Sequence, residues 1–185
     1  MDIAEKKQLL REEIFQIKKN YTSEALYLLS TKALQLLEQT EIFQSSSCIA
    51  LYHAISGEVQ TSKFIEKWHP KKRIVLPLIV ENDLKLLLYQ GKESLQPGKF
   101  GILEPSISCC PQIPETEVEC IIIPGIAFDR QHNRMGRGKG YYDRLLNTIS
   151  APKIGLCFHF QLVENVPTDF FDKKMDYIVT DEEII

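Results

Sequence analysis

Six short, continuous apolar runs are the feature that most constrains the fold of this chain. They are CIALYH (48–53), RIVLPLIV (73–80), LKLLLY (84–89), VECIIIP (118–124), KIGLCFHF (153–160) and DYIVT (176–180). Their length and composition predict strands. Because they are continuous rather than alternating, they favour a parallel sheet that is covered on both faces. Segments with helical spacing at 61–68 and 141–149 separate some of them, so at least two strand-helix-strand units are expected.

Two amphipathic helices are expected before the first strand. Residues 2–19 place apolar side chains at helical spacing, with Asp2 as the N-cap. Thr22 begins a second helix that carries Glu24 in its first turn. Pro77 predicts an edge position or a bulge for its strand. The polar residues 81–83 predict a turn, after which the chain returns as the second arm of a hairpin.

Length and composition favour one globular domain over residues 1–185. The chain has 22 basic and 25 acidic side chains and a net charge of −3, which argues against a general nucleic-acid-coating protein. No apolar stretch approaches a membrane span, and the N-terminus lacks the core of a signal peptide. The five cysteines include no CxxC pair, and Cys48, Cys120 and Cys157 lie in apolar runs. We therefore expect buried thiols, a cytoplasmic location, and a core large enough for a monomer.

The segment 90–117 contains four of the nine prolines and no sustained period. Loops of this length are usually functional or disordered. Because Phe100, Ile102 and Leu103 are apolar and are followed by Glu104 and Pro105, we expect an ordered loop that lines a site. A mobile surface connection is the alternative.

The segment 121–146 departs most from the average composition. Five basic residues against two aspartates give residues 129–144 a net charge of about +3. Three alternate glycines, Gly136, Gly138 and Gly140, precede the expected helix. Glycine lets backbone N–H groups approach an anion closely, and Arg137 and Lys139 add positive charge. We therefore expect an anion site, with a flexible tight turn as the alternative.

This glycine pattern matches neither common nucleotide motif. A Walker loop needs Lys followed by Ser or Thr, and a dinucleotide loop needs GxGxxG, whereas GxGxG is followed here by Tyr141 and Tyr142. The tyrosine rings could flank a planar heterocycle. Asp143 could cap the following helix or hold Mg²⁺ against phosphate oxygens. A second carboxylate for the metal would come from Asp172 or Asp176.

The stretch PGIAFDRQHNRMGRGKGYYDRLL resembles the signature of the 5-formyltetrahydrofolate cyclo-ligase family, whose members are also called 5,10-methenyltetrahydrofolate synthetases. KKQLLR, IALYHAISGEVQT, GILEP and VPTDFFDKKMDYIVT resemble further elements of the family and occur in the family's order. The resemblance covers nearly the whole chain. It implies a three-layer α/β fold with a Rossmann-like, mostly parallel sheet flanked by helices. It also implies ATP- and Mg²⁺-dependent closure of 5-formyltetrahydrofolate to 5,10-methenyltetrahydrofolate.

The resemblance also implies roles for individual residues. Arg137 and Lys139 are expected to be catalytic by stabilising charge on the phosphoryl group, and Asp143 and Asp172 to assist Mg²⁺. ATP is expected to contact Lys7, Gln8, Leu9, Leu10, Arg11, Arg134, Met135, Gly136, Arg137, Gly138, Lys139, Gly140, Tyr141 and Tyr142. The folate substrate is expected to contact Arg11, His53, Glu58, Arg137, Gly138, Lys139, Gly140 and Tyr141. For His53, a strand-end histidine satisfied within the protein is an equal alternative.

Two other functions remain open on the residues alone. A non-catalytic nucleotide- or polyanion-binding module could use the same basic loop, and an enzyme of similar architecture could act on a sugar phosphate. Lys71, Lys72 and Arg73 could attract a polyglutamate tail, although a solvated charge run before a strand is favoured. The expected partners are small molecules, with neither nucleic acid nor membrane among them.

Overall fold

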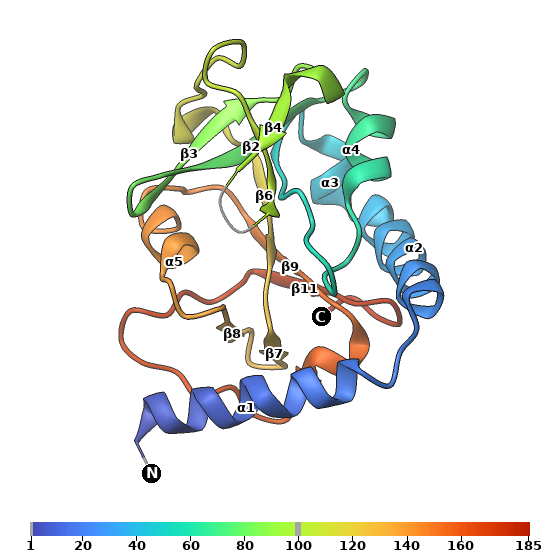
Figure 1. Cartoon of the computed structure of the whole chain (residues 1–185), viewed down its shortest axis with the longest axis vertical. Coiled ribbons are helices and arrows are strands. Elements are labelled where there is room, and N and C mark those ends of the chain that lie inside the picture. The colour runs from blue at the N-terminus through green and yellow to red at the C-terminus, as the bar shows by residue number, and fades with distance from the viewer. Residues whose placement is uncertain (1, 99–100) are drawn as a thin grey trace.

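The computed structural model describes residues 2–98 and 101–185, and a six-stranded sheet forms the centre of this part of the chain (Figure 1). The strand order is β11-β9-β6-β1-β2-β3. All neighbouring pairs are parallel except β2 and β3, which form the expected hairpin. The bounds are β1 (Cys48–Ala50), β2 (Arg73–Val80), β3 (Asp83–Leu88), β6 (Cys120–Pro124), β9 (Lys153–Leu156) and β11 (Tyr177–Val179). The mostly parallel sheet is therefore confirmed, with several strands shorter than the apolar runs that predicted them.

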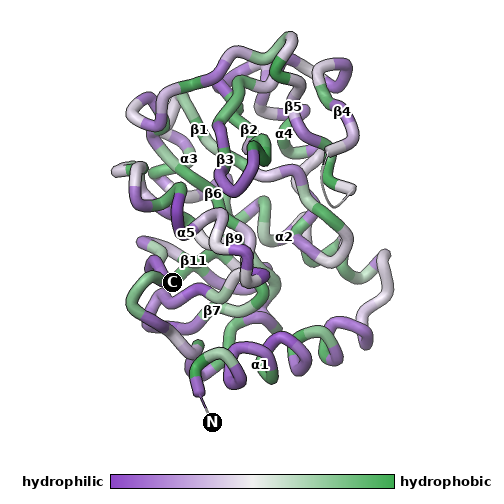
Figure 2. Tube along the Cα trace, turned by 60° about the vertical axis from the view of Figure 1, so that its left-hand side comes forward, coloured by the Kyte–Doolittle hydropathy of each residue, from purple (hydrophilic) through white to green (hydrophobic). Residues whose placement is uncertain are grey.

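Helices cover both faces of this sheet, as expected for a three-layer α/β fold. Figure 1 shows α2 (Ser23–Gln39), α3 (Glu41–Ser45) and α4 (Ser62–Trp68) on one side of the sheet and α5 (Tyr141–Leu145) on the other. Alternate residues of a strand enter the two cores. Ile49 packs under α2, α3 and α4, whereas Cys48 and Ala50 pack on the α5 side. Figure 2 shows hydrophobic residues along the central strands.

The helix starts follow the expected caps. The Glu5 N–H donates to Asp2 Oδ1 at 2.7 Å at the start of α1 (Ile3–Lys18), and the Ala25 N–H donates to Thr22 Oγ1 at 3.1 Å. The short helix α3 was not expected. Thr40 ends α2 and caps α3, which redirects the chain toward β1. The expected helix over 141–149 is wrong in length, because α5 ends at Leu145 and continues as turns.

A second, three-stranded sheet consists of β7 (Ala127–Asp129), β8 (Arg134–Met135) and β10 (Leu162–Val163). Helix α1 packs on it through Ile14, which is buried with Ala127 and Met135. Figure 1 shows α1 running beneath β7 and β8. The buried Asp129 carboxylate accepts the N–H groups of Gln131, Asn133 and Val166. This small sheet therefore fixes the segment that leads into the glycine-rich loop.

The proline-rich segment 90–117 is ordered where the structure describes it. β4 (Leu95–Pro97) pairs with β5 (Leu103–Pro105) as an antiparallel hairpin that packs on β2. Phe100 lies outside the described residues. Short 3-10 turns occur at η1 (Lys92–Ser94), η3 (Glu115–Glu117) and η4 (His159–Gln161).

Pro77 does not place β2 at the edge of the sheet, because β2 lies between β1 and β3. The pairing of β1 with β2 ends early, however, with the Leu51 N–H donating to the Val75 carbonyl at 2.9 Å. The Ile74 carbonyl accepts from Tyr89 on the β3 side, so by alternation Pro77 faces the β1 side. Lacking an N–H, Pro77 cannot continue the pairing with β1. The far half of β2 is therefore an open edge on that side.

The order of the parallel strands creates a crevice. From β1 the chain crosses to β2 on one side, and it later enters β6 on the other side of β1. In open α/β sheets, ligands bind where the connections diverge in this way, at the carboxyl ends of the two strands. The residues that follow β1 and β6 are therefore the ones to inspect for a site. None of the described helices is long and apolar enough to span a membrane.

Candidate active site

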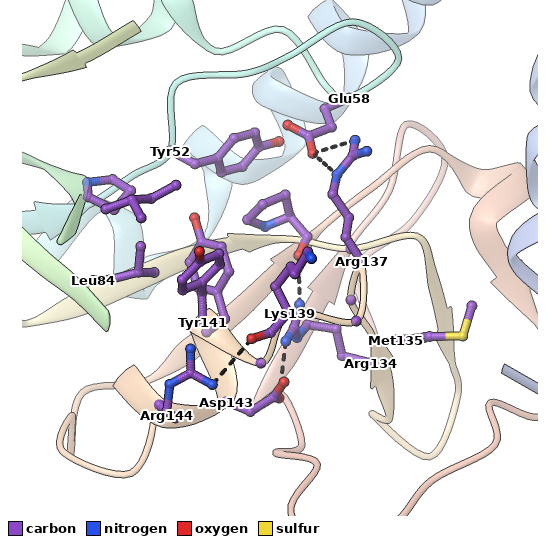
Figure 3. Close-up of a pocket in the computed structure, with 18 of the residues that line it drawn as sticks. Tyr52, Glu58, Leu84, Arg134, Met135, Arg137, Lys139, Tyr141, Asp143 and Arg144 are labelled. Atoms are coloured by element: carbon purple, nitrogen blue, oxygen red, sulfur yellow. Dashed lines mark hydrogen bonds and ion pairs between the residues drawn. The ribbon is translucent and has the colours of Figure 1, made fainter. Parts of the chain in front are cut away.

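A cavity of about 680 Å³ opens at the carboxyl ends of β1 and β6. It is lined by side chains from α1, from the segment after β1, from the β2–β3 hairpin, from β5, from the glycine-rich loop and from residues 169–172. Figure 3 shows Leu84 and Tyr141 on one side of this cavity, Arg137 and Glu58 on the other, and Lys139 between them. Segments distant in the sequence therefore meet at the crevice that the strand order creates.

The glycine-rich loop forms one wall of the cavity, from Gly136 to Gly140. Gly138 and Gly140 have φ values of +92° and +67°, which favour glycine. Among residues 2–98 and 101–185, none accepts a hydrogen bond from the backbone N–H groups of 137–140. The loop therefore offers free backbone donors to a ligand in the cavity.

Two arginines hold this loop in place. The buried Arg134 donates from Nη1 to the Pro124 carbonyl and from Nη2 to Asp143 Oδ1, both at 3.1 Å. Arg144 donates from Nη1 to the Lys139 carbonyl at 3.2 Å (Figure 3). Its Nε donates to Asp83 Oδ1 at 3.1 Å. The loop is thus tied both to the end of β6 and to the β2–β3 hairpin.

Asp143 does not cap α5, because the N-cap residue is Gly140 and no side chain bonds there. Its carboxylate instead pairs with Arg134 and lies at the cavity wall. The two tyrosines that follow the loop also line the cavity. The guanidinium of Arg144 lies 5.4 Å from the ring centre of Tyr141, and that of Arg134 lies 5.6 Å from the ring centre of Tyr142. Burial raises the pKa of Tyr142, which therefore stays neutral.

Lys7 and Arg11 lie on the face of α1 that lines the cavity, as four-residue spacing on a helix requires. Gln8, Leu9 and Leu10 do not line it. Gln8 bonds to Glu12, Leu9 is exposed, and Leu10 packs with the core under α1. Of the five residues of α1 that are expected to contact ATP, Lys7 and Arg11 are the two that line the cavity. Arg11 Nε donates to the Gly136 carbonyl at 3.3 Å and so contacts the glycine-rich loop directly.

Lys7 joins α1 to the loop at 169–172. Its Nζ lies 2.8 Å from Asp169 Oδ2 and 2.5 Å from Asp172 Oδ2. Burial lowers the pKa of Lys7, but the hydrogen bonds and charges of the two aspartates outweigh it, so this pKa is raised. The hydrogen bond from Lys7 also lowers the pKa of Asp169. Asp169 was not expected from the sequence, where only its spacing of three from Asp172 could have indicated it.

Asp176 lies away from the cavity, directly before β11, and accepts the Lys153 N–H at 2.8 Å. Of the two carboxylates considered for a metal beside Asp143, only Asp172 lines the cavity. Within the described residues, no three His, Cys, Asp or Glu side chains gather closely enough to hold a metal by themselves. Asp143 and Asp172 fit Mg²⁺, which binds through one or two carboxylates together with phosphate oxygens and water.

Glu58 and His53, which follow β1, both line the cavity. Glu58 Oε1 accepts from Arg137 Nη2 at 3.0 Å, and its Oε2 accepts the Ile55 N–H at 3.2 Å. His53 is half-buried, with Nε2 3.4 Å from Ser62 Oγ. Burial lowers the pKa of His53, so the ring is neutral at neutral pH. The structure thus supports both a cavity position and an internal partner for His53.

The wall of the cavity opposite the glycine-rich loop is apolar, and the sequence predicted only some of its residues. The expectation that residues 102–104 line a site is confirmed. Tyr52 and the open edge of β2 were missed, because their positions depend on where the pairing of β1 with β2 ends. The apolar wall consists of Pro77, Ile79, Leu84, Ile102 and Leu103. Lys71, Lys72 and Arg73 lie at the other end of β2 and do not line the cavity. The favoured solvated charge run is wrong for two of them, because Lys72 donates to the Gln44 and Ser46 carbonyls and Arg73 pairs with Glu117.

Comparison with known proteins decides the family. A model of the 5-formyltetrahydrofolate cyclo-ligase family matches residues 3–181. The chain belongs to this family. The 5-formyltetrahydrofolate cyclo-ligase of Haemophilus influenzae is 33% identical over 91% of this chain and 94% of its own. The Escherichia coli K12 protein of the same name is 29% identical over 74% of this chain and 79% of its own.

Solved structures agree with the assignment to the cyclo-ligase family. The 5,10-methenyltetrahydrofolate synthetase of Aquifex aeolicus superposes with a TM-score of 0.87 at 33% identity, covering 96% of this chain and 91% of that one. The synthetase of Mycoplasma pneumoniae gives a TM-score of 0.76 at 26% identity, covering 98% and 100%. The expected fold class is confirmed, and membership of a ligase family favours catalysis over a binding module or a sugar-phosphate enzyme.

Proposed function

We propose that the chain catalyses the ATP- and Mg²⁺-dependent cyclisation of 5-formyltetrahydrofolate to 5,10-methenyltetrahydrofolate, releasing ADP and phosphate. The observation that carries this proposal is that one cavity has a wall of hydrogen-bond donors and positive charge facing a wall of apolar side chains. One wall offers the free N–H groups of the glycine-rich loop and the Lys139 ammonium, and the other is apolar. A triphosphate suits the first wall and a flat heterocycle suits the second. Lys139 lies between them (Figure 3).

The chemistry requires activation of an amide. Nitrogen 5 carries a formyl group whose oxygen is a poor leaving group. ATP activates this oxygen: the oxygen attacks the γ-phosphorus, and ADP leaves. The resulting iminium phosphate is attacked at carbon by nitrogen 10, which loses its proton, and phosphate then leaves with the former formyl oxygen. Such a reaction depends on positioning and charge neutralisation rather than on a protein nucleophile.

Lys139 and Arg137 are the proposed catalytic residues. None of the described side chains pairs with the Lys139 ammonium, so it can meet the transferring phosphoryl group without losing another contact. Arg137 is held by Glu58 and would exchange this partner for a phosphate oxygen when the substrates bind. The other proposed ATP contacts are Arg134, Met135, Gly136, Gly138, Gly140, Tyr141, Tyr142, Lys7 and Arg11.

A partner exchange is also proposed for the acidic residues. Lys7 neutralises Asp172, and Arg134 neutralises Asp143. When nucleotide binds, Lys7 and Arg134 would turn to phosphate oxygens and leave both carboxylates to Mg²⁺. The metal would supply positive charge that neutralises the phosphate oxygens. Arg11, His53, Glu58 and Tyr141 would contact the folate.

The proposal is tested by mixing the protein with 5-formyltetrahydrofolate, Mg²⁺ and ATP at mildly acidic pH and following the near-ultraviolet absorbance of the methenyl product. We expect a rise that requires all three components. A folded protein that gives no ATP-dependent rise would contradict the proposal. ATP binding without product would favour the non-catalytic module.

We further infer that the protein acts in the cytoplasm as a single-domain monomer on small molecules, without nucleic-acid or membrane partners. The free cysteines Cys48, Cys120 and Cys157 are buried, and the net charge is −3, which supports a reducing compartment and disfavours polyanion coating. Light scattering on the eluted protein tests the monomer, for which a mass near 21.3 kDa is expected.

A further inference from the structure

The apolar wall of the cavity carries a buried carboxylate, Glu104, to which no role has been assigned so far. Glu104 belongs to β5 and is 4% exposed, and among the described residues it is the most deeply buried carboxylate that lines the cavity. Its Oε1 accepts the Ile79 N–H at 3.3 Å. Its Oε2 lies so close to Gly98 that a Cβ there would overlap it. The carboxylate is therefore held between β2 and the β4–β5 hairpin.

The position of Glu104 follows from the open edge of β2. By strand alternation, the N–H of Ile79 points toward the β1 side, which Val75 and Pro77 also face, but β1 has already ended there. The Glu104 carboxylate meets this N–H in place of a strand. Pro77, Ile79 and Leu84 surround the same place with apolar surface. A carboxylate thus lies at the back of an apolar slot, which is costly unless it is hydrogen-bonded.

Such a slot suits a flat ring with two adjacent donors on its edge. The 2-amino-4-oxopyrimidine ring of a reduced pterin presents its ring N–H and its amino group side by side. A carboxylate has about four acceptor sites on two oxygens, so two adjacent donors can bind beside the contacts that Glu104 already makes within the protein. The apolar side chains would pack on the faces of the ring.

We propose that Glu104 recognises the 2-amino-4-oxopyrimidine edge of the substrate and determines the specificity for pterins. This inference rests on the proposed function. The pyrimidine edge lies at the far end of the pterin from carbon 6, which carries the side chain with nitrogen 10. With this edge at Glu104, the reacting nitrogens face away from the apolar wall, toward the glycine-rich loop.

Glu58 is the competing carboxylate. Both of its oxygens accept hydrogen bonds, from Arg137 and from the Ile55 N–H. It also lies beside Arg137, across Lys139 from Leu84 and the apolar wall (Figure 3). Arg137 would release Glu58 when the substrates bind, but Glu58 then still lies across Lys139 from the apolar wall, where it can contact another part of the folate than the pyrimidine edge.

The test compares the variants Glu104→Gln and Glu58→Gln. Glutamine at 104 keeps an acceptor oxygen for the Ile79 N–H but removes the charge and replaces one acceptor with a donor. Calorimetry without ATP measures the affinity for 5-formyltetrahydrofolate and for its analogue with methyl in place of the 2-amino group. Wild-type protein should prefer the natural compound by roughly 10- to 100-fold, the worth of a hydrogen bond to a charged group. Glu104→Gln should lose most of this preference and keep its ATP affinity, and Glu58→Gln should retain the preference.

A purely structural Glu104 would lower the melting temperature of Glu104→Gln and leave the preference unchanged, which would overturn the assignment. Loss of the preference in Glu58→Gln alone would also overturn it. Wild-type protein that neither binds 5-formyltetrahydrofolate nor forms product would overturn the proposed function together with this inference. Normal turnover with an unchanged preference in Glu104→Gln overturns the Glu104 assignment alone.

Discussion

The cations that line the cavity differ in what they already contact. Lys7 pairs with two aspartates, Arg137 pairs with Glu58, and Arg134 and Arg144 hold the glycine-rich loop. Lys139 has no such partner among the described residues. In the proposed reaction, a phosphate of ATP would meet Lys139 without displacing a protein group. The Lys139 ammonium is therefore the side chain whose loss should affect turnover most directly.

We predict that Lys139→Ala lowers kcat by about 10²- to 10³-fold, the usual cost of removing a preorganised charge contact to a transition state. The melting temperature should change little, because Lys139 is exposed. Lys32→Ala, at an exposed lysine on α2, is the matched control and should keep wild-type turnover. A folded Lys139→Ala protein with near wild-type kcat would contradict the assignment.

The half-buried His53 predicts how the stability of the protein depends on pH. Because burial lowers its pKa below 6.5, the unfolded chain binds this proton more readily than the folded one. The contribution of His53 to the free energy of unfolding should therefore fall as pH drops through 6.5 toward the folded pKa. Melting curves from pH 7.5 to 5.5 should show a smaller loss for His53→Gln than for wild type. An NMR titration that places the pKa of His53 at or above 6.5 would refute this prediction.

At the scale of elements, the glycine-rich loop combines backbone strain with its proposed role in ATP binding. Gly138 has φ +92°, and a Cβ there would lie 3.3 Å from Arg11 Nη2. Gly138→Ala should cost about 1–3 kcal/mol of stability and also weaken ATP binding. Gly91, with φ +105° and no neighbour within 4 Å of a Cβ, is the matched control. Gly91→Ala should lose similar stability and retain its KM for ATP, and equal effects of the two substitutions on this KM would contradict a nucleotide role for the loop.

The sequence predicted the elements that have a regular pattern and missed those that do not. The strands and the starts of α1 and α2 follow from apolar runs and capping side chains. The small sheet of β7, β8 and β10 was missed because its strands have only two or three residues each, too few to show a period. The end of β1 at Ala50 was missed for another reason, since Pro77 stops the pairing from the neighbouring strand.

At the scale of the whole molecule, the site is held together by ion pairs between residues that are far apart in the sequence, and the sequence could not predict these pairs. The resemblance named Lys7, Glu58, Arg137 and Asp172 but not their partners. Arg137 bonds to Glu58 across 79 residues, and Lys7 bonds to Asp172 across 165. Asp169 and the apolar wall were missed because their role depends on which segments the strand order brings to one crevice.

In the proposed reaction, the γ-phosphoryl group of ATP is transferred to the formyl oxygen in this crevice. An isotope experiment tests it most directly. 5-Formyltetrahydrofolate labelled with ¹⁸O in the formyl group is converted with ATP and Mg²⁺, and the released phosphate is analysed by mass spectrometry. Because the formyl oxygen leaves with the phosphate, we expect one ¹⁸O atom in each phosphate formed with methenyl product. Methenyl product accompanied by unlabelled phosphate, with the label released into water, would contradict it.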